Sequence, residues 1–308
     1  MMGRRNFLAG LAAIGTGGPT LAQPMQAVAE PTVLETGSAH YHTAELRLPH
    51  PVPGLADHRI RIAWPRGPVP EGGFPALHML DGRAVAALLD EPLLARLAAR
   101  GGPAIVAHGH ARATRFATLE RAQDYTPPDA EGRPVADPRG RAGGGALDYL
   151  ALLTGEILPR VETRAPLDPA RRLLWGHSYG GLFVLQAALA AGGAFARFVA
   201  ASPALWWDDA RFYARVLASV ERGLSPMPVL DLHSGSAERA RASRPSNPDA
   251  QDLLRMRDAL PEGALDRLSE ALRGHGVAGE TLVFDGLSHG ESFASSARTT
   301  LLETALEL

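Results

Sequence analysis

The chain has 308 residues, a formal net charge of −2 at pH 7, and contains 45% hydrophobic and 21% charged residues. This composition is typical of a globular protein with enough apolar surface for a core, and the near-neutral charge argues against a protein that binds nucleic acid through phosphate contacts. The chain has no cysteine, which excludes disulfides, zinc–thiolate sites, iron–sulfur clusters and a cysteine nucleophile.

The first 29 residues are expected to be a twin-arginine signal peptide. Arg4 and Arg5 precede a short, weakly apolar stretch over residues 7–14, and Ala27-Val28-Ala29 has the small residues of a cleavage site. The alternative is a cytosolic N-terminal helix. The apolar stretch is too short for a membrane anchor, and no other run approaches that length. We therefore expect residues 30–308 to form a single periplasmic or secreted domain without a membrane anchor.

The rest of the chain alternates between strand-like and helix-like patterns. Strands are predicted over residues 43–48, 58–64, 74–80, 103–107, 171–176, 198–202, 228–233 and 280–285. Helices are predicted over residues 83–100, 146–164, 180–191, 210–221, 250–273 and 291–306. This order predicts an α/β fold with a mostly parallel eight-stranded sheet, covered by helices on both faces. Loops 108–145 and 234–250 follow strands and are expected at the ligand-binding edge.

One pentapeptide indicates nucleophilic catalysis. The segment Gly176-His177-Ser178-Tyr179-Gly180 matches G-x-S-x-G, between a predicted strand and a predicted helix. A sharp strand-to-helix turn of this kind exposes the serine, and the start of the helix favours developing negative charge. The alternative is an ordinary glycine-rich helix start. The surrounding strand and helix favour Ser178 as a nucleophile.

A serine nucleophile needs a base, and in this architecture the order along the chain is serine, acid, histidine. Three histidines follow Ser178: His233, His275 and His289. His233 closes a predicted strand, which is typical of a core histidine, and His275 precedes a strand. His289 follows the last strand, where a loop can return the imidazole to the nucleophile. We therefore predict His289 as the base.

The acid is less sharply defined by the sequence. Glu238 lies in the loop after the seventh predicted strand and fits the expected position best. Asp231 lies within that strand, and Asp285 follows the eighth strand, so both remain alternatives. Glu238 is otherwise a solvated loop charge, and a serine–histidine pair without a carboxylate also remains open.

The oxyanion hole is predicted from two backbone N–H groups. One belongs to Tyr179, directly after the nucleophile, and the other to Gly82 or Arg83 in the loop after the third predicted strand. Trp206 and Trp207 are candidates for an aromatic wall of the substrate pocket, although at least one of them is expected in the core.

Arginines in the loop over residues 108–145 are candidates for binding an acidic or catecholate substrate. Arg112, Arg115 and Arg121 lie there, and a guanidinium binds oxyanions well. The same loop also carries acidic residues, so mutual ion pairs are the favoured interpretation, with Arg121 kept as a substrate-binding candidate.

Two sequence patterns that could indicate a cofactor or metal site are not supported by the residues around them. The G-x-G-x-x-G over residues 274–279 precedes a strand and starts no helix, which argues against a dinucleotide site. His108 and His110 are interpreted as a loop pair, because no carboxylate spacing supports a metal site. We expect no metal and no cofactor, and a small-molecule ester as the partner.

The chain resembles the putative esterase branch of the α/β-hydrolase superfamily, and within it the periplasmic siderophore esterases that open catecholate trilactones. The resemblance rests on five segments in the family's order, which are 80–82, 121–127, 176–181, 202–207 and 288–290. It implies that Ser178 is the nucleophile and His289 the base. The family sometimes uses a serine–histidine pair alone. Relatives often carry Asn where this chain has Arg83.

Three functions follow as hypotheses. The first is an exported serine esterase that hydrolyses carboxylic esters, including siderophore-type lactones, without a cofactor. The second is an acyltransferase that resembles mycolyltransferases and uses the same residues with another acceptor. The third is a periplasmic binding protein on a hydrolase scaffold, which would bind a ligand without turnover.

Overall fold

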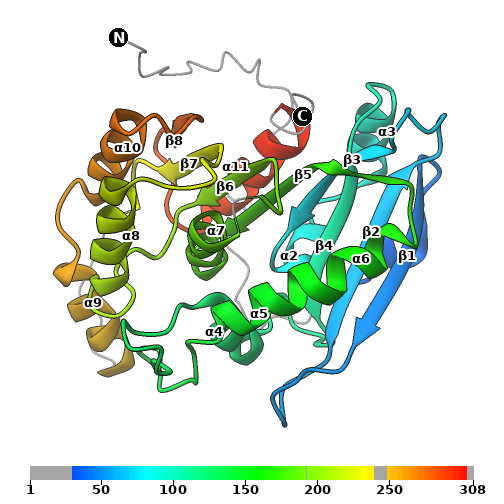
Figure 1. The fold of residues 1–308 in the computed structure, drawn as a ribbon. Helices are drawn as coiled ribbons and strands as arrows, with labels where there is room; N and C mark the ends of the chain where they lie inside the picture. Colours follow the sequence, from blue (N-terminus) through cyan, green and yellow to red (C-terminus); the bar gives the residue numbers. More distant parts are fainter. Residues whose placement is uncertain (1–29, 192, 239–247, 304–308) are drawn as a thin grey trace.

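The computed structural model describes residues 30–191, 193–238 and 248–303 of the chain (Figure 1). The predicted signal peptide, residues 1–29, lies outside the described residues. The strands are β1 (Tyr41–Leu48), β2 (His58–Pro65), β3 (Phe74–Met79), β4 (Ala104–His110), β5 (Leu167–His177), β6 (Arg197–Ala201), β7 (Leu230–Gly235) and β8 (Thr281–Phe284). The helices before β5 are α1 (Val33–Thr36), α2 (Gly82–Ala86), α3 (Glu91–Ala98), α4 (Thr118–Tyr125), α5 (Ala146–Leu152), the π-helical turn η1 (Leu153–Ile157) and α6 (Leu158–Glu162). The later helices are α7 (Tyr179–Ala190), α8 (Arg211–Arg222), α9 (Pro248–Ala259), α10 (Ala264–Gly274) and α11 (Glu291–Leu302).

The eight strands form one sheet in the order β1-β2-β4-β3-β5-β6-β7-β8. The pairs β1–β2 and β2–β4 are antiparallel, and all the others are parallel. The prediction of a mostly parallel eight-stranded sheet is confirmed. Because β3, β4 and β5 run parallel, their carboxyl ends lie at one edge of the sheet. The strand order also reverses in this region, and ligands bind at such a point in α/β sheets.

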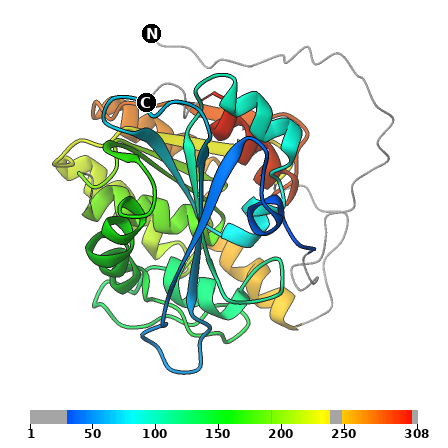
Figure 2. The ribbon, with the colours of Figure 1, turned by 90° about the vertical axis from the view of Figure 1, so that its right-hand side faces the viewer.

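Helices cover the sheet on both faces (Figure 2). One face packs against α4 to α10, with Phe183 of α7 and Val216 of α8 in its core. The other face packs against α1, α2, α3 and α11, with Val85 of α2 and Phe293 of α11 in its core. Among the described residues, no helix combines the length and the apolar character that crossing a membrane requires.

Turn residues divide two of the predicted helices. The helix expected over residues 83–100 is two helices, since the Asp90 side chain accepts a hydrogen bond from the Leu93 N–H and caps the start of α3. The helix expected over residues 250–273 is also divided, into α9 and α10, by a turn that contains Pro261. Proline lacks the N–H that a continuous helix needs. Helix α4 lies within the expected loop over residues 108–145.

Buried histidines make stability depend on pH. Burial lowers the pKa of His108 to about 3 and that of His233 to about 4. A ring with a lowered folded-state pKa contributes stability that is fully present above its unfolded pKa of about 6.5 and is lost as the pH falls toward the folded value. We therefore expect the free energy of unfolding to decrease from about pH 6.5 to about pH 4.

Urea denaturation at constant ionic strength measures this dependence. His233→Gln should flatten the decrease, whereas His275→Ala, at an exposed position, should leave it unchanged. A free energy of unfolding that stays constant across this pH range would contradict the interpretation.

Candidate active site

Ser178 lies in the turn between β5 and α7 in a strained backbone conformation. Its φ is 60° and its ψ is −113°, values that non-glycine residues rarely adopt. A Cβ atom at Gly176 would lie 2.5 Å from the Gly180 carbonyl oxygen, so the approach of strand and helix requires glycine there. The turn leaves the Ser178 side chain partly exposed at the carboxyl edge of the sheet. This is the geometry of a nucleophile elbow.

The structure brings Ser178, His289 and Glu238 into direct contact. His289 Nε2 lies 3.1 Å from Ser178 Oγ, and His289 Nδ1 lies 3.1 Å from Glu238 Oε2. The His289 and Glu238 side chains are 28% and 21% exposed, so the group is reachable from solvent. A hydroxyl, an imidazole and a carboxylate in this order can activate the hydroxyl for attack on an acyl carbon.

Hydrogen bonds orient the other oxygen of Glu238. Ser202 Oγ donates to Glu238 Oε1 at 2.5 Å, and the Gly235 N–H donates to the same oxygen at 2.7 Å. Burial opposes ionisation of Glu238, but His289 and these donors outweigh it and lower its pKa. Glu238 is therefore held as a carboxylate that accepts a hydrogen bond from the imidazole.

A second buried hydroxyl and a second imidazole support the group. Ser292 Oγ lies 2.8 Å from Ser202 Oγ and 3.2 Å from His177 Nε2, and it donates to the His289 carbonyl at 2.9 Å. The ring of His177 packs 4.7 Å from that of His289 between centroids. Burial, the nearby His289 and Arg121 hold the pKa of His177 well below its usual range. No role for Ser202, Ser292 or His177 was predicted from the sequence, although Ser202 and His177 lie in the segments 202–207 and 176–181 that carry the family resemblance.

The alternative bases and acids lie elsewhere. His233 Nδ1 is 2.8 Å from Ser296 Oγ in the core, and His275 is exposed. Asp231 forms an ion pair with Arg197 at 2.6 Å, and Asp285 accepts a hydrogen bond from Ser236 at 3.1 Å. No contact between these side chains and Ser178 is found in the described residues.

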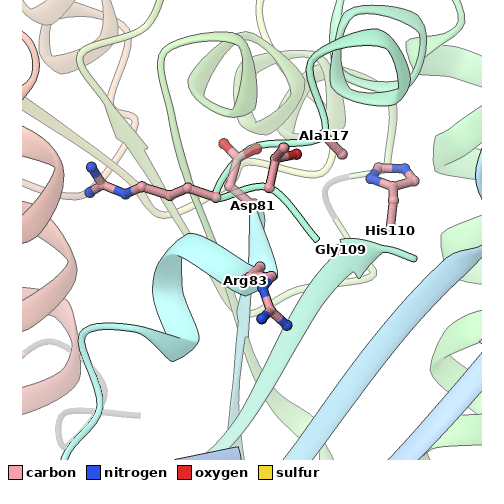
Figure 3. A pocket seen from close by; sticks show the side chains of 8 residues that line it. Asp81, Arg83, Gly109, His110 and Ala117 are labelled. Atoms are coloured by element: carbon pink, nitrogen blue, oxygen red, sulfur yellow. The ribbon is translucent and has the colours of Figure 1, made fainter. Parts of the chain in front are cut away.

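The loop between β3 and α2 lies beside the elbow. Gly82 and Arg83 are the first residues of α2, and Tyr179 is the first of α7, so their N–H groups have no acceptor within their own helices. A Cβ atom at Gly82 would lie 2.6 Å from the Ala107 carbonyl oxygen, so glycine is needed where the loop approaches β4. Figure 3 shows Asp81 and Arg83 of this loop opposite Gly109 and His110 of β4, around a cavity of about 10 Å³.

Arg121 holds this loop from α4. Its Nε and Nη2 donate to the two carboxylate oxygens of Asp81 at 2.9 and 3.0 Å, and Nη2 also lies 3.4 Å from the His177 carbonyl oxygen. Arg121 is 5% exposed, which leaves little surface for the substrate contact expected from the sequence. Arg112 pairs with Glu120 at 2.6 Å, as the expectation of mutual ion pairs requires.

The two tryptophans occupy different surroundings. Trp207 is fully buried and donates from Nε1 to the Pro127 carbonyl oxygen at 2.9 Å, so it belongs to the core. Trp206 is 8% exposed, and its ring centroid lies 5.9 Å from that of Tyr179. Trp206 is thus also largely buried in the core and is not among the lining residues of the cavity beside Asp81 or of the one beside Asp137, so the structure does not support the expected aromatic wall.

A larger hollow lies between the loop that carries Asp137 and the residues at the start of α8, and neither Ser178 nor His289 is among its lining residues. Its volume is about 410 Å³, and its lining includes Asp137, Asp208, Arg211 and Arg255. The Tyr179 hydroxyl donates to Asp137 Oδ2 at 3.4 Å, which connects the hollow with the residue after Ser178. The volume is within the range of small-molecule sites, and the charged lining favours a polar ligand.

His108 and His110 lie in β4 and not in a loop, which corrects the expectation from the sequence. His108 Nε2 lies 2.9 Å from His78 Nδ1, and His110 Nε2 lies 2.7 Å from Asp124 Oδ2. The carboxylate that the sequence spacing did not reveal comes from α4, which packing brings to the end of β4.

The chain is similar in sequence and in fold to known proteins. The family model described as "Putative esterase" matches residues 56–262. The apo-salmochelin esterase of Escherichia coli O6:H1 strain CFT073 is 34% identical over 292 residues, which cover 93% of this chain and 86% of the relative. The ferri-bacillibactin esterase BesA of Bacillus subtilis strain 168 is 28% identical over 243 residues, covering 75% and 79%. The solved structure of enterobactin hydrolase IroE in complex with DFP has a TM-score of 0.71 and 32% identity, covering 89% of this chain and 99% of that one.

Replacement of Ser178 tests the nucleophile. Ser178→Ala should lower kcat for p-nitrophenyl acetate by about 10⁶-fold, because the triad acts as a unit. A fluorophosphonate probe should label the wild-type protein and not the variant. Ser236→Ala, at an exposed serine, is the control. Near-wild-type turnover by Ser178→Ala would refute the assignment.

Replacement of Glu238 separates a triad from a serine–histidine pair. Glu238→Gln keeps the shape of the side chain but removes the charge that stabilises the His289 imidazolium, and we expect kcat to decrease by about 10⁴-fold. Glu270→Gln, on the exposed surface of α10, should have no effect. Steady-state kinetics distinguishes the two: a decrease in kcat of less than about tenfold would favour a serine–histidine pair without the carboxylate.

Proposed function

This chain belongs to the putative esterase family, and we propose that it is an exported serine esterase that hydrolyses siderophore-type esters. It is a carboxylic ester hydrolase with the α/β-hydrolase fold, as its relatives are. The observation that carries the proposal is the contact of His289 with both Ser178 and Glu238, at 3.1 Å each.

The proposed reaction proceeds through an acyl-enzyme. Ser178 Oγ attacks the ester carbonyl carbon while His289 Nε2 takes the hydroxyl proton, and Glu238 stabilises the imidazolium. The N–H groups of Tyr179 and of Gly82 or Arg83 stabilise the oxyanion of the tetrahedral intermediate. His289 then returns the proton to the departing alcohol oxygen. Water, activated by the same imidazole, attacks the acyl carbon and releases the acid and the free Ser178.

A siderophore lactone is the proposed substrate class. The relatives are named as esterases of apo-salmochelin and of ferri-bacillibactin. The hollow of about 410 Å³, whose Asp137 accepts a hydrogen bond from the Tyr179 hydroxyl, supports this choice, because its aspartates and arginines suit a large polar substrate better than a long acyl chain.

The proposed location is the periplasm or the extracellular medium, by twin-arginine export. The support is the order of the paired arginines, Arg4 and Arg5, the weak apolar stretch and the cleavage site at Ala27-Val28-Ala29.

A substrate panel tests the proposed function. It includes iron-free and iron-loaded catecholate trilactones and p-nitrophenyl esters of increasing chain length, with Ser178→Ala as the blank. We expect a higher kcat/KM for a trilactone than for any p-nitrophenyl ester, because the polar hollow contributes binding energy only with the larger substrate. Hydrolysis of the simple esters alone would contradict the substrate class. Acyl transfer to an added sugar in preference to water would indicate a transferase, and binding without turnover a binding protein.

A further inference from the structure

Three imidazoles surround one carboxylate at the carboxyl edge of the sheet, away from Ser178. His50 lies between β1 and β2, His58 is the first residue of β2, and His110 is the last of β4. The carboxylate is Asp124 of α4. The four side chains are between 1% and 6% exposed, so this is a built interior cluster and not a group of surface histidines.

One ring nitrogen of His50 and one of His58 face the two oxygens of Asp124. His50 Nε2 lies 3.1 Å from Asp124 Oδ1, and His58 Nδ1 lies 3.8 Å from Asp124 Oδ2. One ligand atom from each of His50, His58 and Asp124 lies within 4.8 Å of the other two. Tetrahedral Zn²⁺ with bonds near 2 Å holds its ligand atoms about 3.4 Å apart. The present separations therefore need only small side-chain movements to reach coordination distance.

His58 is the part of the cluster that hydrogen bonding leaves unexplained. Its side chain is 2% exposed, its Nε2 has no hydrogen-bond partner, and the contact of its Nδ1 with Asp124 is longer than a hydrogen bond. Buried polar atoms without a partner are rare in folded proteins. The ring nitrogen that faces Asp124 is Nδ1, which lies too far from the carboxylate for a hydrogen bond, so it is the atom available to an ion.

We propose that His50, His58 and Asp124 form a Zn²⁺ site, with His110 orienting the carboxylate. Two imidazoles and a carboxylate are a ligand set that zinc accepts, with one position left for water. His110 Nε2 lies 2.7 Å from Asp124 Oδ2 and orients the carboxylate, and Oδ1, which faces His50, is the oxygen that would bind the ion. Carboxylate ligands in metal sites are held by outer hydrogen bonds of this kind.

Binding requires one change of protonation in the cluster. The Val52 N–H donates to His50 Nδ1 at 3.0 Å, so the proton of the neutral His50 ring lies on Nε2, facing Asp124. Coordination through Nε2 moves this proton to Nδ1, and the Val52 N–H exchanges its partner for water. Val52 is 38% exposed, so water can reach it. Zinc affinity should therefore include a modest cost for this exchange.

The site would join the β1–β2 connection, β2 and α4, and α4 contacts the loop between β3 and α2. It ties the β1–β2 connection to α4, and α4 in turn carries Arg121, which pairs with Asp81, and Tyr125, whose hydroxyl accepts from the Asp81 N–H at 3.4 Å. The role we assign to the ion is structural, because none of its ligands contacts Ser178 or His289 in the described residues.

Titration of the full chain, stripped of metal with EDTA, tests the proposal with readouts independent of ester hydrolysis. We expect one Zn²⁺ per chain by isothermal titration calorimetry, a zinc-dependent increase in Tm, and the d–d absorption of a nitrogen- and oxygen-coordinated ion when Co²⁺ replaces Zn²⁺. Failure of the wild-type protein to bind one equivalent would overturn the proposal, whatever its esterase activity.

Variants locate the bound ion. His50→Ala and Asp124→Asn each remove a ligand and should abolish the zinc-dependent increase in Tm, with folding checked by circular dichroism. His110→Gln should weaken zinc binding by about 10- to 100-fold. His275→Ala, at an exposed histidine, is the matched control and should bind like the wild type. Equal binding by His50→Ala and the wild type would mean adventitious binding only.

Discussion

The strained turn at Ser178 is the constraint on which the site depends. A non-glycine residue at a φ of 60° costs on the order of 1–3 kcal/mol and persists only where the surroundings hold it. Here β5 and α7 are packed on both sides of the turn, and Gly176 allows their close approach. The strain keeps the hydroxyl at the carboxyl edge and directs the N–H groups that begin α7 toward the same space.

Helix α4 connects the elbow with the rest of the edge. The bidentate pair between Arg121 and Asp81 is almost fully buried, and such a pair is costly to break because a lone charge would remain inside. The same guanidinium reaches the His177 carbonyl oxygen, one residue before Ser178. The loop between β3 and α2 and the elbow are thus held by a common side chain, and Asp124 extends this connection from α4 to His110 at the end of β4.

Local patterns predicted most of the secondary structure and the strand–turn–helix around Ser178, because alternation, helical spacing and glycine placement act over a few residues. They failed at Asp90 and Pro261, where a cap and a proline divide helices that apolar spacing alone would join. The position of His289 after the last strand followed from chain order. That it touches both Ser178 and Glu238 rests on contacts between residues 111 and 51 positions apart.

The amino-acid sequence by itself determined the α/β class, the elbow and its serine, and the excluded cysteine chemistry, since these depend on composition and short-range order. Only the tertiary structure decided that Glu238 faces His289 while Asp231 pairs with Arg197, and that Arg121 holds Asp81 inside the protein. The physical reason is that these contacts join side chains that are distant in the chain. Only the packing of neighbouring strands and helices decides which of them come within hydrogen-bonding distance.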